Sequence, residues 1–527
     1  MATHILALIL KSDASDNSEF ILVRQTPPPK FNDEEYDSLL DSDLWDLPST
    51  KLNRLEAVLE PGAVIEGLQS FSETIDFRNF DLDAAIDRVL GQVGFKVSDI
   101  GAWRVSKFVV EPEFGPGLPV RTIYIVGELT RGDSDLPDLC KWMSVESCLS
   151  LLHDVKPGNV RVGTLAAVGL VNESSRLSGK KVHTNPHYQE YPPGVILVPM
   201  KSRTAKPFLT TNMIIFAPAN VSGEFKDTSS AISGDVLIVD PGCHTNVHEE
   251  LLKIVAALSG KLIVFVTHHH PDHVDGLSII QKCKPDAKLL AHENTMRRIK
   301  RDDWSRDYTS VSGGEDILIG DQRLKVVFAP GHTDGHTALL HVNTHSLIVG
   351  DHCVGQGSVV LDITSGGNMT DYFHSTYKFI DLSPNILIPM HGRVNLWPKN
   401  MLCGYLKNRR SREASILKAI EMGSKTLIDI VAKVYSGVDR AFWIPAASNV
   451  RLHVAHLAEQ GKLPEGFSME RFEKSCGAHF FSRWALIYLT TGVSSFYRKC
   501  STPQLLIAGA VAGFALTCSI RNKFISK

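Results

Sequence analysis

One short stretch, Thr267-His268-His269-His270-Pro271-Asp272-His273, constrains this chain more than any other feature of its sequence. It follows Lys261 to Val266, a run of β-branched and aromatic residues that predicts a buried strand. It precedes Val274 to Cys283, which predicts a helix, and Pro271 and Asp272 suit the first turn of that helix. Because α/β sheets bind ligands at the carboxyl ends of their strands, this loop is a candidate site.

The residue types in the loop are those that hold transition metals. Zinc and similar ions take imidazole nitrogen and carboxylate oxygen, and four candidate ligands lie within six positions. A loop this tight can direct His268 and His270 at one ion, and Asp272 and His273 at a second. Binding two ions needs further ligands, which the rest of the chain has to supply.

Further ligand types follow other short apolar runs. Downstream they are His332 in Pro330-Gly331-His332, Asp351 in Gly350-Asp351, and His391 in Pro389-Met390-His391-Gly392. The runs that precede them are 324–328, 347–349 and 386–388. Upstream, Val236 to Val239 leads into Asp240 in the same way. Five strand ends that each present an acid or an imidazole predict one shared rim.

This ordered set of motifs resembles the metallo-β-lactamase superfamily over about residues 193–400. The resemblance implies an αββα sandwich that holds two Zn²⁺ ions. The ligands of one ion would be His268, His270 and His332. The ligands of the other would be Asp272, His273 and His391, with Asp351 bridging the two ions. Asp240 is expected to support the ligands from behind.

A lone histidine is usually a core or surface residue. Five other histidines lie near the ligands but match no ligand position: His269, His336, His341, His345 and His352. We expect them to support ligands or to face solvent. His336, in Thr333-Asp334-Gly335-His336, is the strongest candidate among them for supporting a ligand.

Length and composition bound the rest of the chain. Its 527 residues are too many for one hydrophobic core, so two to four domains are expected. A hydrophobic content of 43% and a charged content of 21% exclude a disordered chain. The net charge of −3 gives no general attraction for nucleic acid, so any RNA contact would need a local patch. Nine scattered cysteines without a CxxC pair suit an intracellular, reducing compartment.

Residues 1–150 resemble a Nudix-type α/β domain. The supporting features are a strand at Glu19 to Gln25, an apolar element at Leu44 to Pro48, and a helix at Asp83 to Val93 before Gly94-Phe95. That family binds magnesium through glutamates, whereas this chain has Asp87-Arg88 and Gly91-Gln92 where those acids belong. The resemblance therefore implies a catalytically silent domain for packing or recognition. An unrelated α+β domain is the alternative.

Residues 151–192, which end at a double proline, are expected to form an extended linker. Residues 401–473 predict three helices, at Leu402 to Met422, Thr426 to Tyr435 and Ala447 to Gln460. With the turn that follows at Gly461-Lys462, they resemble a winged-helix module, a kind that often contacts nucleic acid. An outward-facing cluster in the first helix is the candidate RNA-binding surface: Lys407, Arg409, Arg410 and Arg412. Alternatively, the helices only brace the metal domain.

The C-terminal region suggests a membrane. Residues 474–503 are expected to lie at a membrane interface, with Arg498 and Lys499 as anchors. Residues 504–520 contain the uncharged run Leu505 to Ile520, which we interpret as a tail anchor, with a buried terminal helix as the alternative. A tail anchor would place the chain on the cytosolic face of an organelle outer membrane (mitochondrion, plastid or peroxisome).

The ligand set predicts a hydrolase. Two zinc ions lower the pKa of a shared water and supply a bridging hydroxide for attack on an ester, thioester, amide or phosphodiester. No GxSxG motif and no catalytic cysteine signature offers another nucleophile. By the family resemblance, Asp272 would take up the proton and His391 would polarise the substrate oxygen.

The substrate class follows from a narrower resemblance. Pro330 to Leu340, Gly350-Asp351 and the winged-helix-like tail resemble the β-lactamase-like endoribonucleases over residues 193–473, which implies single-stranded RNA as substrate. A second interpretation is a glyoxalase II-like thioesterase acting on a small thioester. A third is a membrane-tethered binding scaffold with a structural metal site, although structural sites seldom bridge two ions. None of these features predicts an oligomeric state.

Overall fold

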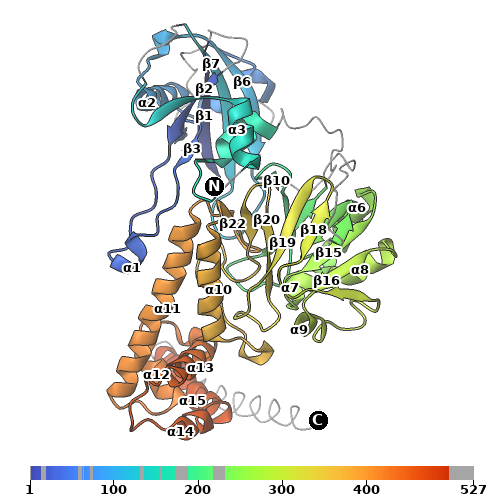
Figure 1. Ribbon diagram of the computed structural model, residues 1–527. Helices are drawn as coiled ribbons and strands as arrows, with labels where there is room; N and C mark the ends of the chain where they lie inside the picture. The colour runs from blue at the N-terminus through green and yellow to red at the C-terminus, as the bar shows by residue number, and fades with distance from the viewer. Residues whose placement is uncertain are drawn as a thin grey trace. The chain divides into compact units, whose positions relative to one another are not determined.

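The fold is taken from a computed structural model, whose chain forms two compact units, Met1–Asn408 and Arg409–Lys527. Figure 1 shows both units and labels many of their helices and strands. The structure describes residues 2–12, 19–56, 62, 64–71, 75–130, 136–154, 157–172, 188–217 and 232–497.

The first unit begins with a nine-stranded sheet of order β5-β6-β7-β1-β2-β3-β9, in which β4 also pairs with β1 and β8 with β2. Its strands are β1 (Thr3–Lys11), β2 (Glu19–Arg24), β3 (Leu44–Asp46), β4 (Ser49–Lys51), β5 (Ile65–Glu66), β6 (Ile100–Val110), β7 (Val120–Leu129), β8 (Cys140–Ser144) and β9 (Arg161–Val162). Helix α2 (Leu82–Val93) packs Ile86, Val89 and Leu90 against one face, because its apolar residues recur at helical spacing. Asp81 caps its start and left-handed Gly94 ends it.

The sheet and its helices continue past residue 150. Helices α3 (Val145–His153) and α4 (Thr164–Ala166) and the turn η4 (Ala167–Val171) bury Leu152, Ala166 and Val171 in the core. The predicted extended linker is therefore wrong for residues 157–172, because their apolar side chains complete this domain. Residues 173–187 lie outside the described residues, and the Nudix resemblance stays a prediction.

A two-sheet sandwich follows. One sheet has the order β10-β11-β12-β14-β15-β16-β17 and the other β13-β18-β19-β20-β21-β22. The first contains β10 (Gln189–Glu190), β11 (Ile196–Lys201), β12 (Thr210–Phe216), β14 (Val236–Val239), β15 (Leu262–Val266), β16 (Lys288–Ala291) and β17 (Tyr308–Ser310). The second contains β13 (Ile232–Gly234), β18 (Asp316–Ile319), β19 (Gln322–Phe328), β20 (Thr337–His341), β21 (Ser346–Ile348) and β22 (Ile386–Ile388).

Burial explains why the central strands are wholly apolar. In β15, Ile263 and Phe265 face the core between the sheets, whereas Leu262 and Val264 face the helices outside. Both faces are covered, so no polar alternation appears. The helices of the sandwich are α6 (His248–Ala257), α7 (Pro271–Val274), α8 (Leu277–Cys283), α9 (Glu293–Met296), α10 (Met369–Leu382) and the first part of α11 (Pro398–Glu421). Figure 1 shows α6 and α8 beside the first sheet and α10 beside the second.

The second unit is described for residues 409–497, and all of its regular secondary structure there is helical. After α11 come α12 (Leu427–Val434), η7 (Arg440–Phe442), α13 (Trp443–Glu459), α14 (Met469–Lys474) and α15 (Ala478–Tyr497). The three predicted helices are thus present as α11, α12 and α13. Residues of all three, among them Ile416, Val431 and Val450, share one core.

The basic cluster does not face outward as predicted. Arg409 is buried and donates to Asn449 Oδ1 at 3.2 Å. Arg412 is half-buried, with its guanidinium 4.2 Å from the ring centre of Tyr435. Arg410 is exposed and Lys407 is half-buried. The cluster is therefore not a single surface of four cations.

Of the C-terminal region predicted to associate with a membrane, the structure describes residues 474–497. Among the residues that the structure describes, none of the helices combines the length and the apolar character that crossing a bilayer requires. The predicted tail anchor at 504–520, together with Arg498 and Lys499, lies outside the described residues.

Candidate metal centre

Five strand ends of the sandwich converge on one site. Strands β14 and β15 are parallel neighbours, and their ends lead to Asp240 and to His268. Strands β21 and β22 are parallel neighbours in the second sheet, and their ends lead to Asp351 and His391. The segment after β19 carries His332. The ligand types predicted from sequence therefore meet at one edge of the sandwich.

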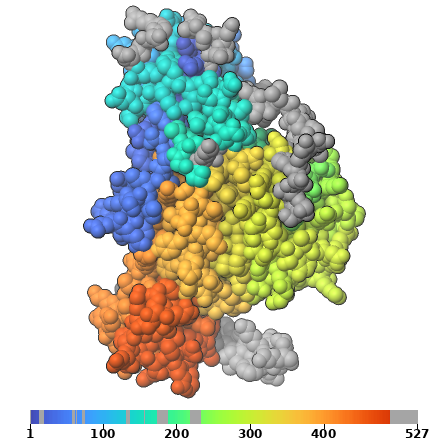
Figure 2. All heavy atoms as spheres, viewed as in Figure 1, coloured from blue at the N-terminus to red at the C-terminus, as the bar shows by residue number. Residues whose placement is uncertain are grey.

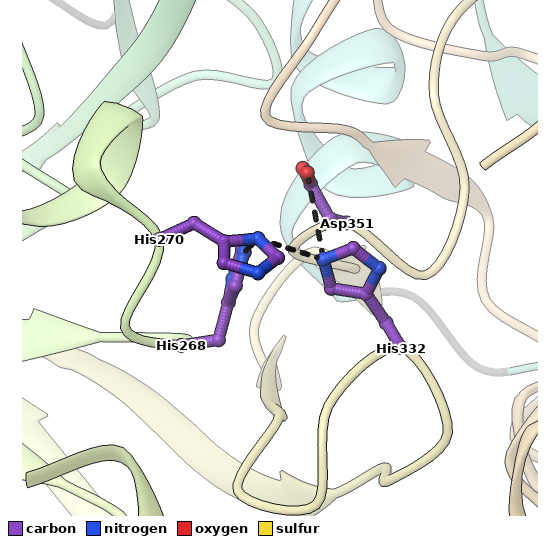
Figure 3. A group of neighbouring side chains, drawn as sticks. All are labelled: His268, His270, His332 and Asp351. Carbon is purple, nitrogen blue, oxygen red and sulfur yellow. Dashed lines mark hydrogen bonds and ion pairs between the residues drawn. The ribbon is translucent and has the colours of Figure 1, made fainter. Parts of the chain in front are cut away.

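The first group of ligands contains His268, His270, His332 and Asp351, and Figure 3 shows their side chains directed at one another. His270 Nδ1 lies 2.9 Å from His268 Nε2 and 3.1 Å from His332 Nε2. Asp351 Oδ2 lies 3.9 Å from His332 Nε2. Three imidazole nitrogens beside one carboxylate oxygen form a donor set typical of zinc and related ions.

The second group contains Asp272, His273 and His391. His391 Nε2 lies 3.3 Å from Asp272 Oδ2, and His273 Nε2 lies 3.9 Å from Asp272 Oδ1. Asp351 Oδ1 lies 3.5 Å from His273 Nε2 and 3.4 Å from His391 Nε2. Because the two oxygens of Asp351 face different groups, this carboxylate stands between the two candidate sites.

The ring nitrogens that point away from the centre are held by acceptors. His332 Nδ1 donates to Val360 O at 2.9 Å, and His391 Nδ1 donates to Thr210 O at 2.9 Å. His273 Nδ1 donates to Asp240 Oδ2 at 2.7 Å. Such bonds fix the tautomer and leave the other nitrogen free to bind a metal.

Asp240 and His336 take the supporting positions expected of them. Asp240 is fully buried and also accepts from Thr267 N at 2.7 Å, which fixes the start of the histidine loop. His336 Nδ1 donates to Ala329 O, and its Nε2 accepts from Asp351 N at 3.0 Å. His336 therefore orients the backbone of the carboxylate between the two groups.

The electrostatics of the site favour cations. Burial lowers the pKa of His332 to about 3, so its imidazole is neutral at physiological pH. Burial opposes ionisation of Asp272, but His273 and His391 lower its pKa to about 2. Burial alone would lower the pKa of His391, but Asp351 and Asp272 raise it to about 10. The acids are thus ionised, and metal binding here would displace protons from histidine.

Two buried atoms test whether metal ions fit. His273 Nε2 and Asp351 Oδ1 are buried without a hydrogen-bond partner among the described residues. Both belong to the candidate ligand atoms, and buried polar atoms are otherwise nearly always paired. The residues present therefore fit metal ions at this centre.

The remaining predicted histidines differ in role. His269 Nε2 lies 3.0 Å from Ser365 Oγ, beside the first group. His345 Nε2 donates to Leu382 O at 2.7 Å. His341 is buried at the opposite end of β20 from His336, and His352 is buried and stacked on Tyr372. His341 and His352 are buried, so neither faces solvent, which was one of the two roles expected of them.

Sequence reasoning missed three contributors. Asp362 Oδ2 accepts from His270 Nε2 at 3.2 Å, but Asp362 follows no predicted strand. Thr204 Oγ1 lies 3.4 Å from His391 Nε2, and the ring of Phe208 lies 5.7 Å from that of His391. Both are on the β11–β12 connection, and a polar loop between two predicted strands was the available signal.

Comparison with known proteins agrees with this geometry. Residues 231–391 match the family described as Metallo-beta-lactamase superfamily, and residues 426–465 match the Beta-lactamase associated winged helix domain. The chain therefore carries a metallo-β-lactamase domain, from a superfamily whose members are generally hydrolases, and the associated winged helix domain.

The individual relatives described next are 30% identical to this chain or less. The Beta-lactamase-like protein 2 homolog of Caenorhabditis elegans is 29% identical over 230 residues, which is 43% of this chain and 75% of that protein. Its counterpart from Drosophila melanogaster is 27% identical, over 41% of this chain and 73% of that protein. A Hydroxyacylglutathione hydrolase from Prochlorococcus marinus is 30% identical, over 30% of this chain and 60% of that protein.

Proposed function

We propose that this protein is a dinuclear zinc hydrolase that cleaves phosphodiester bonds of single-stranded RNA. The observation that carries the dinuclear part is Asp351, whose Oδ2 faces His332 while its Oδ1 faces His273 and His391. A closed structural site has no use for a carboxylate shared between two ligand groups.

The chemistry divides between the ions and the protein. Two zinc ions, when bound, supply a water of lowered pKa and stabilise the negative charge that develops on the substrate. Asp272, the carboxylate of the second candidate ligand group, would take up the proton of the attacking water. His391 would help to hold the second ion, and Thr204 Oγ1, 3.4 Å from His391 Nε2, would donate a hydrogen bond to an oxygen of the bound substrate.

An anionic substrate is supported by cations near the site. Arg203 and Lys206 are exposed and flank Thr204 on the β11–β12 connection. Arg393, whose side chain is 46% exposed, lies two residues after His391. The winged helix domain supports a nucleic acid in particular, since such modules often contact it. Arg203 forms an ion pair with Asp275 and Arg393 forms one with Glu111, so Lys206 is the cation best placed to attract a phosphate group.

The decisive experiment uses the zinc-loaded full chain, labelled single-stranded RNA and a panel of small thioesters. Asp272→Asn should keep the fold and remove most turnover of RNA, because the amide cannot accept the proton. Asp302→Asn, at an exposed position, is the matched control. Metal analysis should find two zinc ions per chain. Full turnover in Asp272→Asn, or a preparation without zinc, would contradict the proposal.

A thioesterase is the second candidate. The similarity of residues in this chain to a Hydroxyacylglutathione hydrolase favours it, and the burial of Arg409 weakens the RNA-binding surface predicted from sequence. Hydrolysis of a thioester without cleavage of RNA would replace the first candidate with this one. The same zinc ions and the same Asp272 would then serve a different substrate.

A further inference from the structure

The segment from Asn385 to Asn400, which carries the candidate ligand His391, is contacted by the N-terminal sheet domain at its start and in its second half. At its start and end, Arg161 Nη1 donates to Asn385 O at 3.0 Å and to Leu396 O. Asp41 accepts from the backbone N–H groups of Lys399 and Asn400 at 2.8 and 3.1 Å. In Figures 1 and 2 the blue segment with α1 (Glu34–Asp37) accordingly lies against the orange start of α11.

Arg161 is placed to fix this segment firmly. Only 4% of the surface of this residue is exposed, and the guanidinium lies 5.0 Å from the ring centre of Trp397. Its Nη2 also donates to Ser42 O at 2.7 Å. A buried guanidinium is tolerated only when its donors are paired, so the acceptors around Arg161 define one position for it.

The β6–β7 loop, residues 111–119, approaches the middle of the same segment. Arg393 Nε donates to Glu111 Oε2 at 3.2 Å and Arg393 Nη2 donates to Leu118 O at 3.3 Å. Thr210, whose carbonyl accepts from His391, donates through Oγ1 to Glu113 O at 3.4 Å. The loop thus contacts Arg393, two residues after His391, and Thr210, which accepts a hydrogen bond from His391.

Gly115 brings this loop into contact with the neighbour of His391. Gly115 has a φ of +116°, and a Cβ added there would lie 2.7 Å from the Phe208 ring. The ring of Phe208 in turn lies 5.7 Å from that of His391. Only glycine allows the loop backbone to pass this close.

We infer that the N-terminal domain is a working part of the metal centre: its β6–β7 loop, acting through Phe208 and Arg393, positions His391 and so sets how tightly the second ion is held. His391 belongs to the Asp272 group and not to the His268 group, so one ion should depend on this loop more than the other. The inference rests on the proposed dinuclear function. Loop residues are positioning residues, since they act through His391.

The test measures zinc, not turnover. In the full zinc-loaded chain, Gly115→Ala should push Phe208 and weaken one of the two zinc ions roughly tenfold, as lost support of a metal ligand typically does. Release of each ion to a chromogenic chelator gives the two affinities. The double variant G115A/F208L should recover most of the lost affinity, because the smaller side chain makes room for the new methyl group. Denaturant unfolding of both variants separates loss of the metal ligand from loss of the fold, since the inference requires the second ion to weaken while the fold is retained.

Gly158→Ala is the matched control, because Gly158 has a φ of +87° in the same domain but nothing within 4 Å of an added Cβ. Gly158→Ala introduces the same kind of backbone strain without a steric clash. It should therefore release both zinc ions as the unsubstituted chain does. Equal weakening of both ions in Gly115→Ala, or no change in either, would overturn the inference. A parent chain that binds no zinc would overturn the proposed function itself, and the inference with it.

Discussion

His270 shows how a single hydrogen bond selects the atom that binds metal. Its Nε2 donates to Asp362 Oδ2 at 3.2 Å, so the proton is held on that nitrogen. Its Nδ1 then carries the lone pair, and this atom is the one that faces His268 and His332. Side-chain hydrogen bonds from His270, Thr364 and Ser365 outweigh burial and hold the pKa of Asp362 well below its usual range. An ionised Asp362 is the stronger acceptor.

Asp362→Asn should therefore weaken metal binding about tenfold, because the neutral amide is a poorer acceptor and can turn its NH₂ group toward His270. The substitution keeps an oxygen that can cap Thr364 N, so the local turn should survive. Competition with a chelator measures the affinity. Asp334→Asn, which breaks the ion pair with Arg298, is the control from the same region. Equal metal affinity in the two variants would show that Asp362 does not support His270.

Lys206 provides a test of substrate class at the level of one residue. It is exposed and lies two positions from Thr204, which contacts His391. If RNA is the substrate, Lys206→Gln should lower affinity and reduce the slope of log affinity against log salt by about 1, because one phosphate contact is lost. Lys253→Gln, on the exposed side of α6, should leave the slope unchanged. A slope that Lys206→Gln does not change would argue against phosphate binding by this loop.

At the level of elements, strand ends were the part of the site that the sequence could predict. The seven candidate ligands and Asp240 all lie on segments that follow a buried strand, and a run such as Leu262–Val266 is recognisable because both of its faces are covered. Asp362 stands at the start of the short turn η6 (Ile363–Ser365), which has no periodic pattern. The acceptors Thr210 O and Val360 O are backbone atoms, which residue type cannot reveal.

In helix α11, the spacing of the apolar residues and the basic residue types gave opposite predictions for the burial of Arg409. Leu402, Leu406, Ile416 and Ile420 are buried at helical spacing. Arg409 falls on the same stripe and is buried, although a cluster of basic residues suggested an exposed face. Periodicity therefore predicts its burial better than charge does. Its guanidinium is accommodated by the side chain of Asn449.

Glu413, also on α11, joins two histidines of α13 within the second unit. Its Oε2 accepts from His456 Nδ1 at 2.6 Å and from His453 Nδ1 at 3.3 Å. Burial raises the pKa of Glu413, but bonds from these histidines lower it below its ordinary value. Burial lowers the pKa of His453 from its ordinary value of 6.5. At both groups the unfolded chain therefore binds protons more tightly than the folded chain.

Acid should consequently destabilise the second unit. Stability is lost as the pH falls through the ordinary imidazole range near 6.5, and further as Glu413 becomes protonated at lower pH. Glu413→Gln should lower the free energy of unfolding by about 1–3 kcal/mol at pH 7 and increase the loss between pH 7 and pH 5.5, because Glu413 favours the protonated form of His453 and so partly offsets the effect of burial on its pKa. Hydrogen exchange of α13 in the full chain, measured at pH 7 and pH 5.5, tests both effects. Glu470→Gln, in the exposed pair with Lys474, should change little.

At the level of the whole molecule, the N-terminal domain and the sandwich behave as one unit in their packing. One core cluster contains Leu22 and Tyr124 of the N-terminal sheet together with Leu197, Phe265 and Ile388 of the sandwich. Tyr191 Oη, next to the sandwich, donates to Val162 O at 2.8 Å. Composition predicted several domains but could not predict that two of them share a core, since such contacts join residues far apart in the sequence.

Substitution of Arg161 tests whether the N-terminal domain and the sandwich stabilise each other. Arg161→Gln removes the donors of Asn385 O, Leu396 O and Ser42 O, which are acceptors from both domains. Leaving buried acceptors unpaired should lower the free energy of unfolding of residues 1–408 by about 2–4 kcal/mol. Denaturant unfolding of the full chain, followed by hydrogen exchange in both domains, measures the loss.

The pattern of the loss matters as much as its size. If the two domains unfold together, exchange should rise in β1 and in β22 alike, because Arg161 joins the sheet of the first to the ligand-bearing segment of the second. Arg24→Gln breaks a pair with Asp43 whose side chains are 48% and 40% exposed, and should cost less than about 1 kcal/mol. Exchange that rises only in the N-terminal sheet after Arg161→Gln would show that the sandwich folds without it.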